Sequence, residues 1–209
     1  MCKIDEVTKL AHQYNMPAVA ITDHGNMHGV IKFYKSAIQN GVKPIIGCEL
    51  YVAPESRFEK KTHGIKDASF HLTCLVKDST GYKNLTKLSS LSYLEGYYYK
   101  PRIDKEILSK YSDGLIILSG CLKSEISHYI LKGEIEKAIE IIGEYQDIVG
   151  KDNFYLELMD TGMEEQKKVN RVLIELSKKT SAGLVATNDC HYLRKEDAFS
   201  HEILSLIHI

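Results

Sequence analysis

Six side chains of the types that ligate metals are found in or just after apolar, strand-like segments. The clearest segment is 18–27, AVAITDHGNM, in which an apolar, β-branched run after Pro17 ends in Asp23 and His24. A buried strand that ends in polar residues delivers them to one edge of a sheet. The six candidate ligands are His24, Glu49, His71, Cys121, Asp189 and His191. Imidazole, thiolate and carboxylate groups together are typical of a transition-metal site.

Taken one at a time, several of these residues also have an interpretation without function. His71 in a strand is more often a hydrogen-bonded core histidine, and a lone cysteine such as Cys121 is more often a small buried hydrophobe. Glu49 in the run IIGCEL differs, because a carboxylate in an apolar strand is costly to bury without a partner. Asp189 and His191 are two residues apart and would project to the same side of an extended backbone. The recurrence of all six candidate ligands at strand ends favours one shared metal site.

Four residues are candidates for catalysis and two for substrate contact. Asp23 precedes His24, and its carboxylate would orient the imidazole and raise its basicity if the turn lets the two meet. The candidate catalytic residues are Asp23, His24, Asp189 and His191. Lys100 and Arg102 lie in a tyrosine-rich loop and are candidates for contact with substrate phosphate, although a solvated charged surface is the commoner role.

The elements that must position these residues follow from the apolar pattern. It predicts about six strands, nearly all separated by helical segments, at 18–22, 43–53, 70–76, 114–119, 154–158 and 183–187. Residues 54–68 are polar and predict a loop. The alternation favours an α/β architecture with a parallel sheet. We prefer a barrel to an open sheet, because only a sheet that closes into a barrel directs the ends of several strands toward one cavity.

The composition is ordinary for a globular protein, with 44% hydrophobic and 26% charged residues among 209. The formal net charge of −1 excludes a strongly basic protein that holds nucleic acid through bulk electrostatics. No apolar run approaches the roughly 20 residues that cross a membrane. The N-terminus, charged from Lys3 onward, also lacks a signal-peptide core, and we therefore expect a cytoplasmic location. The five cysteines are odd in number and form no Cys-x-x-Cys pair, which indicates reduced thiols.

Several longer motifs resemble those of one protein family. They are PAVAITDHGNMHG, KPIIGCELYVAP, YLEGYYYKPRID, LIILSGCL, NFYLELMDTG and VATNDCHYL. Together they resemble the N-terminal PHP (polymerase and histidinol phosphatase) domain of bacterial DNA polymerase III alpha subunits, from about residue 2 to residue 203. YYYKPRID favours that replicative group over stand-alone PHP phosphatases, which remain an alternative.

The resemblance implies a distorted seven-stranded (β/α) barrel that binds up to three divalent metal ions, with zinc, manganese and magnesium as candidates. His24, Glu49, His71, Cys121, Asp189 and His191 match the family's ligand positions. Members that keep the ligands are associated with metal-dependent 3′–5′ exonuclease activity, whereas in other members the domain is a structural scaffold. DNA synthesis would belong to polymerase modules outside this segment. The implied partners are DNA and other replicase subunits, among them a proofreading exonuclease subunit, and no membrane.

Both ends of the chain depart from the family pattern. The family opens with a strand that carries a His-x-His motif and a nearby aspartate, so we expect the first strand and three ligands to be absent. The isolated chain should therefore be a weak or inactive enzyme. Residues 204–209, LSLIHI, do not match the family, and we interpret them as a non-native tail encoded by library adapter DNA. The expected PHP segment is 1–203.

Overall fold

The computed structural model describes residues 2–207, with side chains described through residue 203. The chain forms two compact units, each built from segments that are distant in sequence. The larger unit comprises residues 22–27 and 46–187, and the smaller unit comprises the described parts of 1–21, 28–45 and 188–209. The loop that carries His24 therefore belongs to the larger unit, although the strand before it belongs to the smaller one.

The smaller unit is mainly helical. Its elements are α1 (Ile4–Gln13), β1 (Ala18–Ile21), α2 (Val30–Gln39), the start of β2 (Lys43–Val52), the 3₁₀ turn η3 (Lys195–Asp197) and α8 (Ala198–Ile207). Helices α1 and α2 are joined by a buried hydrogen bond of 2.8 Å between the Thr8 and Ser36 hydroxyls. The expected tail at 204–209 begins within α8, and residues 208–209 lie outside the described residues.

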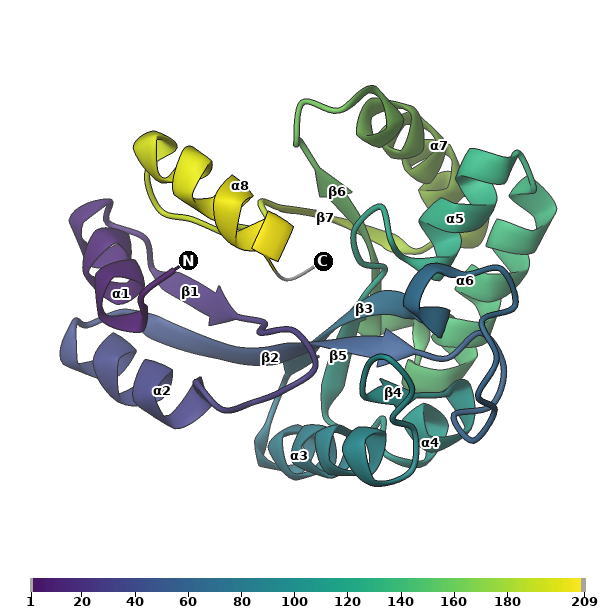
Figure 1. Ribbon diagram of the computed structural model, residues 1–209, viewed down its shortest axis with the longest axis horizontal. Coiled ribbons are helices and arrows are strands. Elements are labelled where there is room, and N and C mark those ends of the chain that lie inside the picture. Colours follow the sequence, from purple (N-terminus) through teal and green to yellow (C-terminus); the bar gives the residue numbers. More distant parts are fainter. Residues whose placement is uncertain (1, 208–209) are drawn as a thin grey trace. The chain divides into compact units, whose positions relative to one another are not determined.

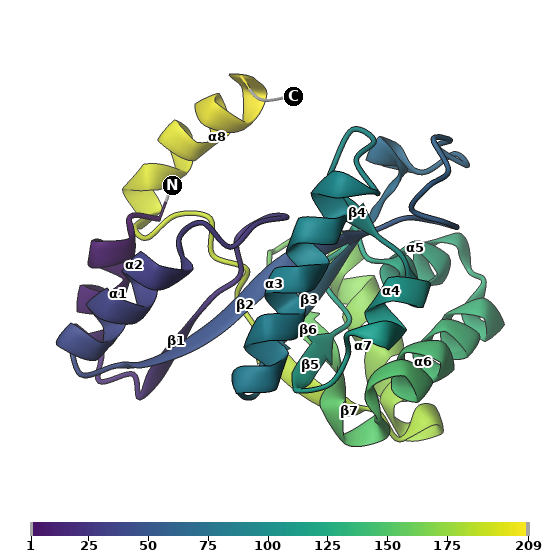
Figure 2. The same ribbon diagram turned by 90° about the horizontal axis from the view of Figure 1, so that it is seen from below.

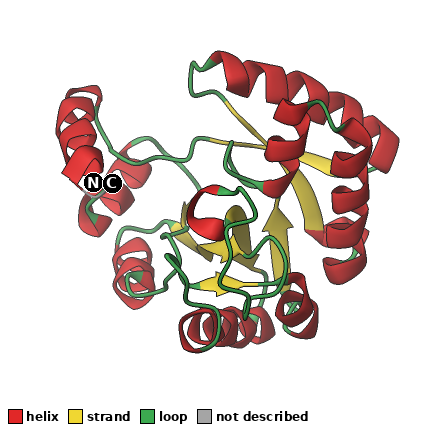
Figure 3. Ribbon diagram, turned by 45° about the vertical axis from the view of Figure 1, so that its right-hand side comes forward, coloured by secondary structure: helices red, strands yellow, loops and turns green. Residues whose placement is uncertain are grey.

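The larger unit is a curled sheet with helices on its outer side (Figures 1 and 3). Its strands are the rest of β2, β3 (Phe70–Val76), β4 (Arg102–Ile103), β5 (Leu115–Leu118), β6 (Phe154–Met159) and β7 (Gly183–Thr187). They lie in the order β2-β3-β5-β6-β7, and β4 also pairs with β2. The unit also contains η1 (Lys66–Ala68), α3 (Ser79–Leu94), α4 (Lys105–Lys110), α5 (Glu125–Lys132), α6 (Ile135–Val149), η2 (Lys151–Asn153) and α7 (Glu164–Thr180). Helix α3 packs on β3 and β5, α6 on β5 and β6, and α7 on β6 and β7 (Figure 2).

Strand β3 runs antiparallel to both of its neighbours. Glu49 of β2 lies opposite Thr73, and Ile117 of β5 lies opposite Cys74. The other pairs, β2 with β4, β5 with β6 and β6 with β7, are parallel. The predicted α/β fold with a curled, barrel-like sheet is confirmed, but an all-parallel sheet is wrong at β3. A parallel connection needs a crossover, usually a helix, and the loop between β2 and β3 contains only the short turn η1.

The predicted strands agree with the observed ones to within one residue at each end. The strand side chains that face the helices, such as Leu50, Leu72, Ile117 and Leu156, are fully buried and form one continuous core with them. The two-residue strand β4 was not predicted, because it is too short to show any apolar period.

Short polar residues begin the helices that follow the strands. The Asp78 carboxylate accepts from two backbone N–H groups at the start of α3, and Asp104 and Ser124 cap α4 and α5 in the same way. Each such cap contributes about 1 kcal/mol to helix stability. Among the helices of the described residues, none combines the length and apolar character that a membrane span requires.

Two glycines in helices offer a test of this packing. A Cβ atom on Gly81 of α3 would lie 1.8 Å from the Gly114 carbonyl oxygen, whereas a Cβ atom on Gly143 of α6 would meet nothing within 4 Å. We expect Gly81→Ala to destabilise the fold by about 2 kcal/mol or more, because the backbone of the 114 turn must move. Gly143→Ala should stabilise it by about 0.5–1 kcal/mol, because alanine is the better helix former. Urea denaturation of both variants measures the difference, and equal midpoints would contradict this account.

Candidate metal centre

Three of the predicted ligands meet in the larger unit. The Glu49 Oε1 atom lies 2.6 Å from His24 Nδ1 and 2.7 Å from His71 Nδ1. One ligand atom from each residue lies within 4.8 Å of the others, which is a spacing that one metal ion can bridge. We call His24, Glu49 and His71 the triad. Glu49 is buried, His71 is partly buried and His24 is exposed, so the centre is open to solvent on the His24 side.

The backbone explains why these three residues converge. Glu49 and His71 are diagonal neighbours on adjacent strands, because Glu49 pairs with Thr73, two residues from His71. The loop with His24 is held to β2 by two backbone hydrogen bonds, from Glu49 N–H to the Asp23 carbonyl and from Gly25 N–H to the Glu49 carbonyl. Gly25 has a φ of 65°, and a Cβ there would lie 2.8 Å from the Tyr51 ring. Glycine is therefore required for the loop to approach this closely.

The environment of Glu49 fits a bound cation. Burial alone raises the pKa of this carboxyl group, but the two nearby imidazoles outweigh burial and lower the pKa to about 2. Oε1 is buried and, apart from these two short contacts, has no hydrogen-bond partner among the described residues. A carboxylate oxygen and two imidazole nitrogens that face one another repel unless a proton or a cation lies between them. The donor set, two nitrogens and one oxygen, suits a divalent metal ion.

Cys121 lies at the edge of the triad. Its Sγ atom is 3.6 Å from His71 Nδ1, and it follows Gly120, whose φ of 87° turns the chain after β5. Its side chain is partly buried. The structure thus brings four of the six predicted ligands together in one unit.

Asp189 and His191 follow β7 and belong to the smaller unit. His191 Nδ1 lies 2.8 Å from the Asp189 carbonyl oxygen and 3.7 Å from the Asp189 carboxylate. Asp189 has a φ of 48°, so the backbone is not extended here as predicted, although the two side chains do lie near each other. The reason is that β7 ends at Thr187, before the pair. A ligand role for these two residues stays a prediction.

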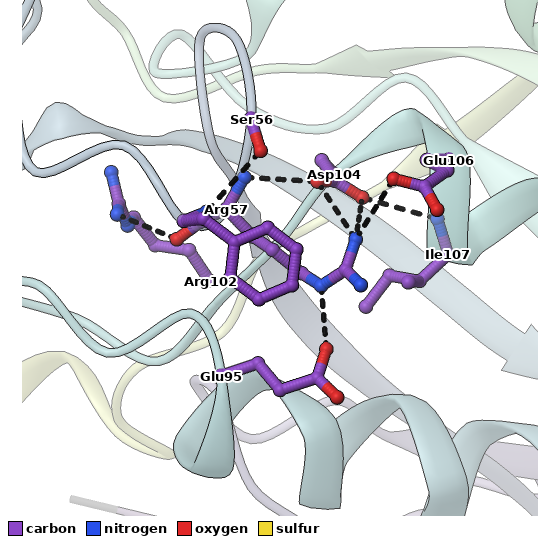
Figure 4. Close-up of polar contacts among 8 residues, drawn as sticks. Ser56, Arg57, Glu95, Arg102, Asp104, Glu106 and Ile107 are labelled. Carbon is purple, nitrogen blue, oxygen red and sulfur yellow. Dashed lines mark hydrogen bonds and ion pairs between the residues drawn. The ribbon is translucent and has the colours of Figure 1, made fainter.

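Arg102 is buried and bonded to backbone carbonyls, one of them that of Arg57 (Figure 4), which does not fit the predicted contact with substrate phosphate. Its side chain is fully buried, and its guanidinium donates to the backbone carbonyls of Gly96, Ala68, Arg57 and Glu59 at 2.9–3.2 Å. It therefore fastens two loops to β4. Lys100 remains suitable for phosphate contact, because it is only partly buried and its Nζ lies 5.8 Å from the centre of the Tyr51 ring. That ring lies 5.2 Å from the His71 ring.

Comparison with known proteins agrees with this geometry. A family model described as the PHP domain matches residues 1–161. The chain belongs to the PHP domain family. The resemblance found in the sequence motifs is thereby confirmed.

The relatives of this PHP domain are longer proteins. It is 54% identical to the DNA polymerase III subunit alpha of Thermus aquaticus over 91% of the chain, and 47% identical to that of Aquifex aeolicus over 97%. A third relative, from Treponema pallidum, is 45% identical over 98% of the chain. The chain spans only 16–18% of the length of these relatives.

A solved structure shares the fold. It is that of a candidate metal-dependent phosphoesterase from Bifidobacterium adolescentis, with a TM-score of 0.57 at 11% identity. The match covers 92% of this PHP domain and 83% of the other chain. At this identity the likeness concerns the fold alone.

Glu157 of this PHP domain is a buried carboxylate that sequence reasoning missed. It is 3% exposed, and it accepts hydrogen bonds from the Thr73 hydroxyl and the Gly120 N–H at 3.1 Å, and from the Thr187 hydroxyl at 2.6 Å. It thus ties β6 to β3, to the turn that carries Cys121 and to the end of β7. The signal was present, because FYLELM is an apolar strand interrupted by one glutamate, just as IIGCEL is around Glu49.

Removing the Glu157 carboxylate should weaken the sheet. In Glu157→Ala, three donors lose their acceptor, and we expect a loss of roughly 2–4 kcal/mol in the free energy of unfolding. Glu157→Gln should lose less, because its carbonyl oxygen still accepts one of these bonds. Urea denaturation measures both, with Glu136→Ala on the exposed surface of α6 as the control. If Glu157→Ala unfolded at the same urea concentration as this control, Glu157 would not join the strands as described.

Proposed function

We propose that the triad binds a divalent metal ion and that this PHP domain hydrolyses phosphodiester bonds of DNA as a 3′–5′ exonuclease, with weak activity at most in the isolated chain. The observation that carries this proposal is the buried Glu49 oxygen between two imidazole nitrogens. In this proposal the metal is zinc, manganese or magnesium, and His24, Glu49, His71 and Cys121 hold it, with Asp189 and His191 as further ligands. A bound divalent ion would lower the pKa of its water and neutralise charge on the phosphate oxygens.

The remaining residues have supporting roles in this mechanism. The Glu49 carboxylate stays ionised at neutral pH, because its pKa of about 2 is far below that pH. It thus contributes the negative charge that favours a divalent cation. Asp23 fixes the loop of His24 through its backbone carbonyl, and its carboxylate is the candidate to orient the His24 imidazole. Lys100, near Tyr51, is positioned to contact a phosphate oxygen of the substrate.

We further propose that the chain is the PHP domain of a bacterial replicative DNA polymerase alpha subunit. Its identity to relatives of that name supports this assignment. DNA and the other replicase subunits would then be its partners, a proofreading exonuclease subunit among them, and DNA synthesis would belong to other modules of the longer protein. The cytoplasm is the proposed location, which fits the free cysteines of the described residues. The reading frame of the gene tests the assignment, which fails if the frame encodes no polymerase modules.

A metal-stabilised scaffold is the second candidate function. The three ligands of the triad come from three different segments, β2, β3 and the loop after β1. A metal ion bound by all three would join these segments, which favours the scaffold. Metal binding to such a site is part of the folding free energy. The scaffold needs no exposed reaction site, whereas hydrolysis needs the open side at His24.

The metal site can be tested by exchanging one ligand. Glu49→Gln keeps the shape of the side chain but removes its charge, and we expect metal affinity to fall by roughly 100-fold or more. Elemental analysis after equilibration with zinc or manganese, together with a competition titration, measures bound metal per chain. Glu136→Gln, on the exposed face of α6, is the matched control. If both variants retained the metal content of the parent chain, the triad would not be the metal centre.

Hydrolysis and scaffolding predict different results in a second experiment. With metal bound, the exonuclease proposal predicts release of nucleotides from 3′-labelled single-stranded DNA, and loss of this activity in His24→Ala. The exposed His12 of α1 provides the control, since His12→Ala should leave the activity unchanged. The scaffold predicts that metal raises the melting temperature while no nucleotide is released. That second result, obtained with a full metal complement, would exclude hydrolysis by this chain.

A further inference from the structure

A small cavity lies beside the triad, and His71 lines both. It has a volume of about 230 Å³ and is formed by the 64–67 loop, the start of β3, the turn after β5 and His128 of α5. Pockets for drug-sized ligands measure roughly 300–1,000 Å³. This cavity therefore has room for a group such as a phosphoryl, but not for a whole nucleotide.

Two lysines give the cavity a positive charge. Lys66 and Lys123 line it with exposed side chains, and neither forms an ion pair with a carboxylate of the described residues. Elsewhere in the same unit Lys105 is held by Glu125 and Glu144 at 2.6–2.9 Å. Asp67 contributes one negative charge to the lining, so the fixed charges sum to +1. The complement of such a lining is an anion.

His128 supplies a polar group that lacks a partner. Its Nε2 atom is buried and has no hydrogen-bond partner among the described residues. The ring is packed against Phe70 and Tyr129, with ring centres 5.3 and 5.2 Å apart. Burial, followed by the charge of Lys132, lowers the pKa of His128, so the imidazole is neutral at pH 7. A buried polar atom without a partner is costly, and a ligand oxygen would offset that cost if the ring turned toward the cavity that it lines.

The backbone couples this cavity to the metal centre. The Lys123 carbonyl accepts a hydrogen bond of 3.1 Å from His71 N–H, and Ser124 N–H donates to the Cys121 carbonyl at 2.9 Å. One turn thus carries both the thiol that lies 3.6 Å from His71 and Lys123, which lines the cavity. A ligand bound here lies next to whatever the triad holds.

We infer that this cavity is a subsite for a second phosphoryl group of the substrate, adjacent to the phosphodiester that is cleaved at the metal centre. The inference rests on the proposed function for the identity of the substrate, a nucleic-acid strand with one phosphate beyond the scissile one. Lys66 and Lys123 pair with the phosphoryl oxygens, and the His128 ring, which lines the cavity, would have to turn toward it to donate to one of them.

The subsite is tested first by binding, without any metal. Inorganic phosphate is titrated into the chain in the presence of a chelator and followed by ³¹P NMR. Lys123→Ala should raise the Kd about tenfold, as expected for the loss of one charge-assisted hydrogen bond, and Lys123→Arg should restore most of the affinity. Lys151→Ala, an exposed lysine of η2, is the control. Equal affinities in Lys123→Ala and Lys151→Ala would indicate an adventitious ion only and would overturn the inference.

The second arm uses two substrates of the metal-loaded chain. Bis(4-nitrophenyl) phosphate contains only the scissile phosphate, whereas a thymidine dinucleotide with a terminal phosphate also contains a second one. Lys123→Ala should raise KM about tenfold for the dinucleotide and leave the other substrate unchanged. Equal effects on both substrates would place Lys123 at the metal centre and overturn a separate subsite. If neither substrate is cleaved by any variant, the proposed function fails, and the binding arm alone decides the subsite.

Discussion

The burial of one carboxylate, Glu49, is the constraint on which the site depends. A glutamate in an apolar strand is stable only with partners, and here its partners are two imidazoles at 2.6 and 2.7 Å. The same contacts lower its pKa, and no further hydrogen-bond partner reaches this oxygen among the described residues. A buried negative charge is costly, and a cation bound beside it would lower that cost. The burial of Glu49 therefore favours the binding of a divalent metal ion.

The reversed direction of β3 makes this contact possible. His71 is the second residue of its strand, so in a parallel sheet it would lie at the edge opposite to the ends of β2 and β5. Because β3 runs antiparallel to both, its start lies beside the carboxyl end of β2 and near the turn that carries Cys121. The strand direction, and not the spacing of ligands along the chain, thus decides which residues share the metal centre.

Buried charges elsewhere in the larger unit support the loops around the site. The buried side chain of Arg57 pairs with Asp104 at 3.1 Å and with Glu95 at 2.7 Å. The Arg102 guanidinium donates four hydrogen bonds to backbone carbonyls. The Glu157 carboxylate holds the turn after β5 and the end of β7 by accepting hydrogen bonds from N–H and hydroxyl donors. The burial of such groups costs about as much free energy as their contacts return, so they add little net stability. Removing one partner, however, leaves a buried charge or donor unpaired, and for this reason these residues fix the positions of the loops.

The sequence by itself determined the strands and the α/β class, because the apolar period is a local property, and its longer motifs carried the resemblance to the family. It also identified His24, Glu49 and His71, since metal-ligand side chains in apolar strands are visible without a structure. Only the tertiary structure decided the direction of β3, the burial of Arg102 and the role of Glu157. Arginine and lysine look alike as surface charges in a sequence, and whether carbonyls surround one of them depends on loops that are distant along the chain. The bend at Asp189 was equally hidden, because a positive φ in a residue other than glycine has no clear local signature.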